Sequence, residues 1–138
     1  MVDRSVKILA RARAMIGAPF RPQGRVSQTG LDCVGLMLVA FSIDPDSVPR
    51  NYRRRSFGLS KVVADMPAVF RRVPRTQRRT GDLLLLKVGP DQGHLAVLSA
   101  VGFIHADAAL GFVTEVPGTP PWPLQAVFRL RSRSKKEG

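Results

Sequence analysis

Residues 31–41, Leu31-Asp32-Cys33-Val34-Gly35-Leu36-Met37-Leu38-Val39-Ala40-Phe41, decide how the rest of the chain is interpreted. After Asp32 this stretch is apolar on every side, which is the pattern of a helix that is buried all round. A buried strand is the competing interpretation of a short apolar run. The length of the run, and an aspartate of the type that caps helix N-termini, favour a helix that begins beside Cys33 and ends before Asp44-Pro45.

The composition is that of a folded and strongly basic domain. The chain has 138 residues, 44% of them apolar, which is enough for one domain with a core of its own. Its 22 Lys and Arg outnumber its 10 Asp and Glu, and the net charge of +12 should attract polyanions. We expect one domain over residues 1–131 and a charged, flexible tail over residues 132–138.

Neither a membrane span nor a signal peptide is expected. The chain has no run of 18 or more apolar residues, and Arg11 and Arg13 interrupt its first apolar stretch. We therefore expect synthesis in the cytoplasm, and transport by another carrier if the protein acts outside it.

The first half of the chain reads as helices joined by loops. Apolar residues at helical spacing predict a helix over residues 3–17, with Asp3 as N-cap and Gly17 as its stop. Residues 60–70 look helical but contain Pro67, which predicts a break. Loops or connectors are expected over residues 18–30, 45–57 and 71–80.

From Gly81 onward the pattern changes to short apolar runs separated by Gly, Pro and Asp, which is typical of strands. Helices followed by a strand meander predict an α+β fold, with N-terminal helices packed on an antiparallel sheet of five to six strands. The predicted strands are residues 83–88, 95–99, 103–106, 112–116 and 126–130.

Cys33 is the only cysteine, so no disulfide can form within the chain. At a helix N-terminus the backbone N–H groups and the helix dipole favour a thiolate, and the same N–H groups can face an oxyanion. Most lone cysteines are simply buried in the core, and that interpretation leads when Cys33 is taken by itself.

The chain has only two histidines, His94 and His105, in two strands that are consecutive in the predicted meander. Side chains alternate between the faces of a strand, so an even-numbered turn near residues 99–102 would put both rings on one face, opposite or diagonal. His94 could then serve as general base to Cys33, with His105 fixing the orientation and tautomer of the His94 ring. Core histidines and a zinc site are the alternatives, and the zinc site lacks a close ligand pair.

Five blocks of the sequence, spread over about residues 5–130, together resemble the NlpC/P60 cysteine peptidases. Their order and rough spacing agree with the family. The blocks are Ile16-Gly17-Ala18-Pro19-Phe20-Arg21, Gly30-Leu31-Asp32-Cys33-Val34-Gly35-Leu36, Gly81-Asp82-Leu83-Leu84, Gly93-His94-Leu95-Ala96-Val97 and Ile104-His105-Ala106.

The resemblance implies a papain-like domain that cleaves peptidoglycan stem peptides, typically between D-glutamate and a diamino acid. It implies Cys33 as nucleophile, His94 as base and His105 as the third residue, with no cofactor and no metal. The chain looks most like the short members carried by phage tails and gene transfer agents. Phage-like tail proteins are therefore expected partners, with action at the periplasmic cell wall.

Two residues depart from the pattern of the family. Val34 stands where many members have Ser, and Phe20 where many have a Tyr whose hydroxyl contacts the site. Both residues, together with Asp32, Arg25 and Tyr52, form the set for which we expect substrate contact.

Three rival functions remain open on the sequence. A thiol acyltransferase or amidase would use the same covalent chemistry on the same scaffold. A tail module that kept the fold without catalysis is the second rival. The third is nucleic-acid binding by the arginine clusters in residues 50–55, 71–79 and 129–136, and it is not expected because few aromatic residues interleave with them.

Overall fold

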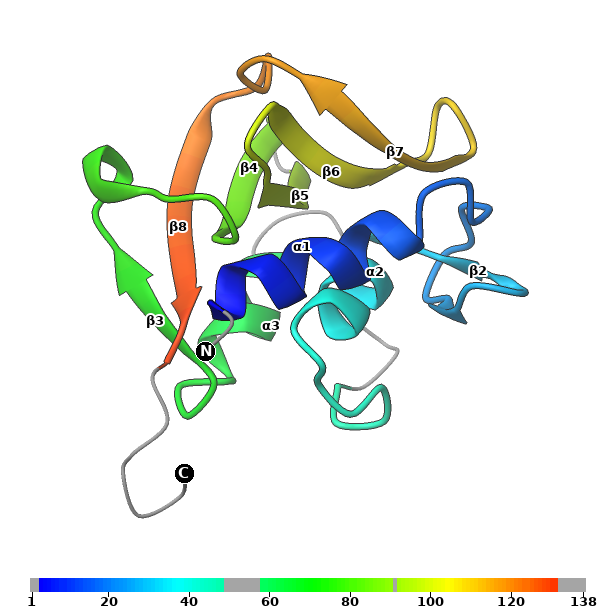
Figure 1. Cartoon of the computed structure of the whole chain (residues 1–138), viewed down its shortest axis with the longest axis horizontal. Coiled ribbons are helices and arrows are strands. Elements are labelled where there is room, and N and C mark those ends of the chain that lie inside the picture. Colours follow the sequence, from blue (N-terminus) through cyan, green and yellow to red (C-terminus); the bar gives the residue numbers. More distant parts are fainter. Residues whose placement is uncertain (1–2, 49–57, 91, 132–138) are drawn as a thin grey trace.

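The computed structural model describes residues 3–48, 58–90 and 92–131. Helices α1 (Arg4–Ala14), α2 (Cys33–Ala40) and α3 (Gly58–Ala64) come before most of the sheet in the sequence. Figure 1 shows these helices against a curled sheet, so the predicted α+β architecture is confirmed. The sheet strands are β3 (Phe70–Val73), β4 (Leu83–Gly89), β5 (Gln92–Leu98), β6 (Gly102–Asp107), β7 (Phe112–Pro117) and β8 (Leu124–Leu130).

The sheet has six strands in the order β3-β8-β4-β5-β6-β7, and every neighbouring pair is antiparallel. Strands β4 to β7 form the predicted meander, in chain order. Strand β8 then returns to pair with both β3 and β4, so the last strand of the chain lies inside the sheet. The five predicted strands are confirmed, and the sheet has the larger of the two expected strand numbers.

Two predicted loops contain strands. β3 begins at the last residue of the expected broken helix and runs into the connector expected over residues 71–80, and it is followed by a 3₁₀ turn over Arg75–Gln77. Its ends Phe70 and Val73 are buried while the two arginines between them are exposed, so local alternation is absent. The loop before α2 contains β1 (Arg25–Val26) and β2 (Gly30–Leu31), a two-stranded sheet.

Helix α1 begins where the sequence predicts and ends slightly earlier. The Oδ1 of Asp3 accepts a hydrogen bond from the Ser5 N–H at 2.9 Å, which caps the helix. Gly17 takes a φ of 91° just beyond the last turn, a left-handed conformation that glycine adopts without strain.

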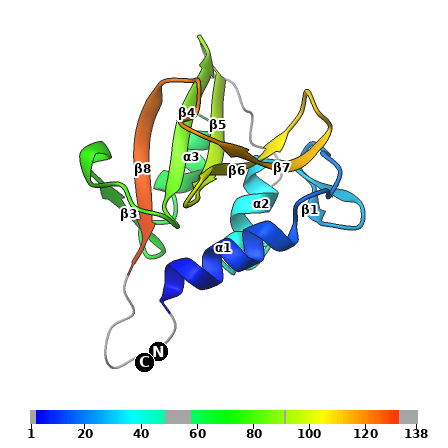
Figure 2. The ribbon, with the colours of Figure 1, turned by 45° about the horizontal axis from the view of Figure 1, so that its top comes forward.

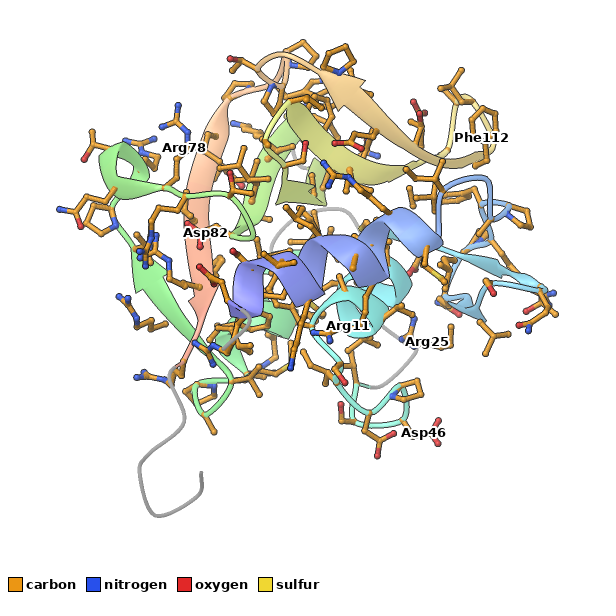
Figure 3. All side chains as sticks on the ribbon, viewed as in Figure 1. Arg11, Arg25, Asp46, Arg78, Asp82 and Phe112 are labelled. Atoms are coloured by element: carbon orange, nitrogen blue, oxygen red, sulfur yellow. The ribbon has the colours of Figure 1, made fainter. Side chains whose placement is uncertain are left out.

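Helix α2 is a buried helix and not a strand, as its apolar run favoured. Asp32 caps it through Oδ1, which accepts from the Gly35 N–H at 2.8 Å. It ends at Ala40, before the predicted stop at Asp44. Arg11 of α1 donates to the Ala40 carbonyl at 2.9 Å, placing a cation at the negative end of the α2 dipole (Figure 3).

The sheet separates two apolar clusters of unequal size. The larger cluster, here the helix-side core, joins α1, α2 and α3 to sheet residues such as Leu95, Val97 and Ile104. In the turned view, α1 and α2 lie next to each other and α3 lies behind β4 and β5 (Figure 2). The smaller cluster, here the outer core, includes Ala96 and Phe103 on the other face of the sheet.

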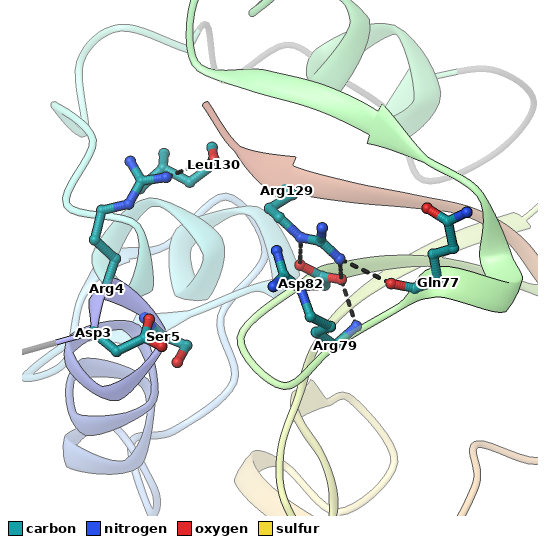
Figure 4. Close-up of polar contacts among 8 residues, drawn as sticks. All are labelled: Asp3, Arg4, Ser5, Gln77, Arg79, Asp82, Arg129 and Leu130. Carbon is teal, nitrogen blue, oxygen red and sulfur yellow. Dashed lines mark hydrogen bonds and ion pairs between the residues drawn. The ribbon is translucent and has the colours of Figure 1, made fainter. Parts of the chain in front are cut away.

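A buried ion pair fastens the start of β4 to β8 (Figure 4). Asp82 accepts from Arg129 Nε at 2.8 Å and from Nη2 at 2.9 Å, and its second oxygen also accepts from the Arg79 N–H at 2.7 Å. Arg129 reaches on to the Gln77 carbonyl. Asp82 therefore shapes the entry of β4.

Within the described residues, none of the helices has the length and apolar composition that crossing a membrane requires.

Candidate active site

Cys33 is the first residue of α2 and is 2% exposed. Asp32, the N-cap before it, is also buried and accepts two backbone hydrogen bonds through different oxygens. One comes from Gly35 in the first turn of the helix, and the other from the Gln23 N–H at 2.8 Å. Asp32 therefore ties the preceding loop to the start of the helix and fixes the backbone around the thiol.

Glycine is required at position 35 by the closeness of this loop. A Cβ added there would lie 2.0 Å from the carbonyl oxygen of Gly24, far inside contact distance. The loop therefore crosses directly over the first turn of α2. Arg25, on the same loop, is buried with its Nη1 3.6 Å from Asp32 Oδ1, and it donates to the carbonyls of Gln23 and Gly24 (labelled in Figure 3).

His94 and His105 meet across β5 and β6. The Nε2 atom of His94 lies 2.9 Å from the Nδ1 atom of His105, and both side chains are buried. The register pairs Val97 with Ile104 and Leu98 with Phe103, which leaves four residues between the last paired positions. The prediction that the two rings share one face is therefore confirmed, and they take the diagonal arrangement.

The ladder between β5 and β6 is short for strands of seven and six residues. Within the described residues its pairs are Leu98 with Phe103 and Val97 with Ile104, so pairing ends before either histidine is reached. Helix α2 packs against both strands from the helix side. The two histidines thus lie where the sheet opens, on strands that contact the helix bearing Cys33.

An aromatic cluster encloses the histidine pair. The ring centroid of Trp122 lies 5.9 Å from the centroids of both His94 and His105, and the ring of Phe103 lies 4.9 Å from that of His105. Trp122 thus contacts both histidines, which no local sequence pattern indicated.

Asp107 is a further neighbour that the sequence interpretation did not include. Its Oδ2 lies 3.8 Å from Nε2 of His105, the ring nitrogen that does not face His94. Burial lowers the pKa of His105 below its ordinary value, because a charged ring loses its hydration, and the Asp107 carboxylate opposes that shift. His105 therefore favours the neutral form.

Of the five residues for which substrate contact was expected, four lie within the described residues. Asp32 and Arg25 are buried in the contacts described above, and the Val34 side chain is fully enclosed in the helix-side core. Phe20 is half-buried and packs against the same core. Tyr52 lies outside the described residues.

The part of the chain that the structure describes contains no candidate metal site. There, no group of three or more His, Cys, Asp or Glu side chains is arranged to hold a metal ion.

Solved structures with the same arrangement of elements are known. The P60 domain of an antigen from M. avium subspecies paratuberculosis matches with a TM-score of 0.58 at 23% identity, covering 91% of this chain and 92% of that chain. The peptidoglycan hydrolase RipB from Mycobacterium tuberculosis matches with a TM-score of 0.61 at 24% identity, covering 91% of this chain and 64% of that chain.

RipD from Mycobacterium tuberculosis is a third neighbour, described as a non-catalytic NlpC/p60 domain protein adapted to peptidoglycan binding. It matches with a TM-score of 0.59 at 20% identity, over 95% of this chain and 98% of that chain. No protein-family model matches the sequence, and no curated protein matches it. At these identities the likeness is one of architecture, and the chain has the papain-like α+β fold of the NlpC/P60 domains.

Proposed function

We propose that this protein is a cysteine peptidase that cleaves peptidoglycan stem peptides, with Cys33 as nucleophile, His94 as general base and His105 as the residue that orients it. The observation that carries the proposal is the 2.9 Å contact between His94 Nε2 and His105 Nδ1. Because this contact engages Nε2 of His94, we assign Nδ1 as the atom that acts on the thiol, in the base-and-orienter pairing of a triad.

The reaction begins with the proton of the thiol. Nδ1 of His94 takes that proton, and the thiolate sulfur attacks the carbonyl carbon of the scissile peptide bond. When the tetrahedral intermediate collapses, the C–N bond breaks and His94 returns the proton to the leaving amine. In the second half, His94 takes a proton from water, which attacks the thioester. The C–S bond breaks and His94 returns the proton to sulfur, which frees the carboxylate and restores the thiol of Cys33.

The oxyanion would be held by the backbone at the start of α2. In a helix the first N–H groups have no partner within the helix. Here the Gly35 N–H is taken by the Asp32 side chain and the Leu36 N–H by the Asp32 carbonyl. The N–H groups of Cys33 and Val34 precede them, and we assign these two to the oxyanion.

The substrate class rests on the fold and on charge. RipB, a neighbour with this fold, is described as a peptidoglycan hydrolase. A net charge of +12 favours approach to an anionic wall. We further propose that the protein cuts the D-glutamyl–diamino acid bond and that a phage-like tail carries it to the periplasmic wall. Phe20 and Tyr52 would contact the substrate.

The test is digestion of purified muropeptides, followed by chromatography and mass spectrometry. The wild-type protein should release fragments cut within the stem, and Cys33→Ala or His94→Ala should lower kcat/KM by at least about 10³-fold. Phe20→Ala and Tyr52→Ala should raise KM with a smaller effect on kcat. Full activity in Cys33→Ala would overturn the mechanism.

A non-catalytic peptidoglycan-binding module is the second candidate, and the likeness to RipD favours it. Alkylation separates the two candidates. A catalytic Cys33 should react with iodoacetamide at neutral pH faster than a model thiol and should slow in His94→Ala, because its thiolate depends on the histidine. Sacculus binding together with slow, His94-independent alkylation would favour the binding module. Transfer to an added amine acceptor would identify an acyltransferase.

A further inference from the structure

We infer that Asp107 is a positioning residue that sets the tautomers of His105 and, through it, of His94. The inference rests on the proposed function for its catalytic meaning, but its geometry is independent of that function. It adds a fourth member to the group formed by Cys33, His94 and His105.

The two carboxylate oxygens of Asp107 face different partners. Oδ1 accepts from the backbone N–H groups of Ala109 at 2.9 Å and Leu110 at 3.1 Å, which anchors the side chain in the turn after β6. Oδ2 lies 3.8 Å from Nε2 of His105. This distance is too long for a hydrogen bond, so Oδ2 acts through its charge.

The charge favours a proton on the nearer ring nitrogen. With its proton on Nε2, His105 has a lone pair on Nδ1 and can only accept from His94. His94 must then carry its own proton on Nε2, and its Nδ1 is the acceptor that the Cys33 thiol needs. Reversing the His105 tautomer would also reverse the tautomer of His94. A proton would then lie on Nδ1 of His94, the nitrogen that has to act as base.

The groups that surround His105 identify Asp107 as the charge that selects its tautomer. β5 contributes His94, and β7 places Thr114 opposite His105. The loop before β8 contributes Trp122. α2 also packs on β6, and Cys33 is its one titratable side chain. Among these groups, Asp107 is the carboxylate.

Asp107→Asn tests the inference directly, because the turn fixes the orientation of the amide that the substitution introduces. Only its oxygen can accept from Ala109 and Leu110, so the NH₂ group takes the place of Oδ2 and presents a donor to Nε2 of His105. The variant should therefore invert the His105 tautomer. Asp107→Ser keeps an acceptor for the turn, places nothing opposite Nε2, and should have an intermediate effect.

Tautomers are read by long-range ¹H–¹⁵N NMR correlations in the Cys33→Ala background at about pH 8, above the ordinary histidine pKa. With Asp107 present, His105 should carry its proton on Nε2, and Asp107→Asn should move it to Nδ1. In the chain with Cys33, Asp107→Asn should lower kcat/KM by about tenfold or more, the equivalent of one pKa unit, with Asp107→Ser in between.

Asp44→Asn is the matched control. Asp44 is exposed and makes a similar turn contact, with Oδ1 accepting from the Asp46 N–H at 2.9 Å, so its amide should leave tautomers and rate unchanged. A His105 proton on Nδ1 while Asp107 is present would overturn the inference, as would an unchanged tautomer in a folded Asp107→Asn. Absence of peptidase activity would remove the proposed function, while the NMR result would still decide the role of Asp107.

Discussion

The Nε2 atom of His94 lies 2.9 Å from the Nδ1 atom of His105, beyond the point where the ladder between their strands has ended. If the ladder continued regularly, His105 would pair with Ala96, one step along the same face from His94. The rings therefore bridge the strands at the level where backbone pairing stops. Because the contact uses a defined nitrogen of each ring, any other partner of a ring approaches its second nitrogen.

Replacing His105 should affect catalysis more than folding. His105→Gln keeps a side-chain acceptor for His94 Nε2, whereas His105→Ala removes it and leaves space beside Phe103. We expect kcat/KM to fall by about 10-fold for the glutamine variant and by about 10³-fold for alanine, the second value being within the usual range for general-base contributions. Muropeptide kinetics on variants of matched melting temperature would check this. Equal activity in the two variants would contradict an orienting role.

Stability should fall as the pH drops below the ordinary histidine range. Burial lowers the pKa of His105 in the folded state below its value of 6.5, so the unfolded chain binds more protons around and below that pH. The contribution of the neutral ring is fully present above about pH 6.5 and is lost as the pH falls through the folded pKa. Urea unfolding at a series of pH values should show this loss, and His105→Gln should flatten it. An identical slope in both proteins would exclude His105 as the source.

Gly35→Ala should damage both the fold and the site. The added Cβ would meet the backbone oxygen of Gly24 at 2.0 Å, and neither the helix nor the loop that Asp32 holds can move away freely. We expect a loss of about 3 kcal/mol in the free energy of unfolding, at the upper end for overpacking. Gly89→Ala is the control, because its Cβ would meet its nearest neighbour, a Gln92 side-chain atom, at 3.4 Å. Urea unfolding would measure both variants, and equal losses would show that the loop does not press on α2.

Elements with a strong local signal could be predicted from the sequence, including most of the sheet, the Asp32 cap and the shared face of the histidines. The arrangement that depends on strand order could not. β8 inserts between β3 and β4, and Leu124 pairs with Leu86, which pairs in turn with His94. This row of three residues brings the loop that carries Trp122 over the histidines, and no pattern within that loop indicates it.

The position of β3 could not be predicted from the sequence for a related reason. Its two central arginines are both exposed on an end strand, so the sequence lacks the alternation that marks a half-buried strand. The role of Asp107 beside His105 could not be predicted, because an aspartate in this position is typical of a turn, and Oδ1 does have that role. The second oxygen gains its importance only from the ring that the fold places 3.8 Å away.

Trp122 should report directly on the histidine pair, because it is the only tryptophan of the chain. Its ring lies 5.9 Å from both imidazoles, so protonation of either ring should quench its fluorescence as the pH falls. Trp122→Ala would admit water to His105, raise its pKa towards 6.5, and cost about 2 kcal/mol for a half-buried aromatic. The pKa of His105 in this variant would be measured by NMR, with Trp122→Phe as the control that retains a ring. An unshifted His105 pKa in Trp122→Ala, together with pH-independent fluorescence in the wild type, would mean that Trp122 does not shield the histidines in solution.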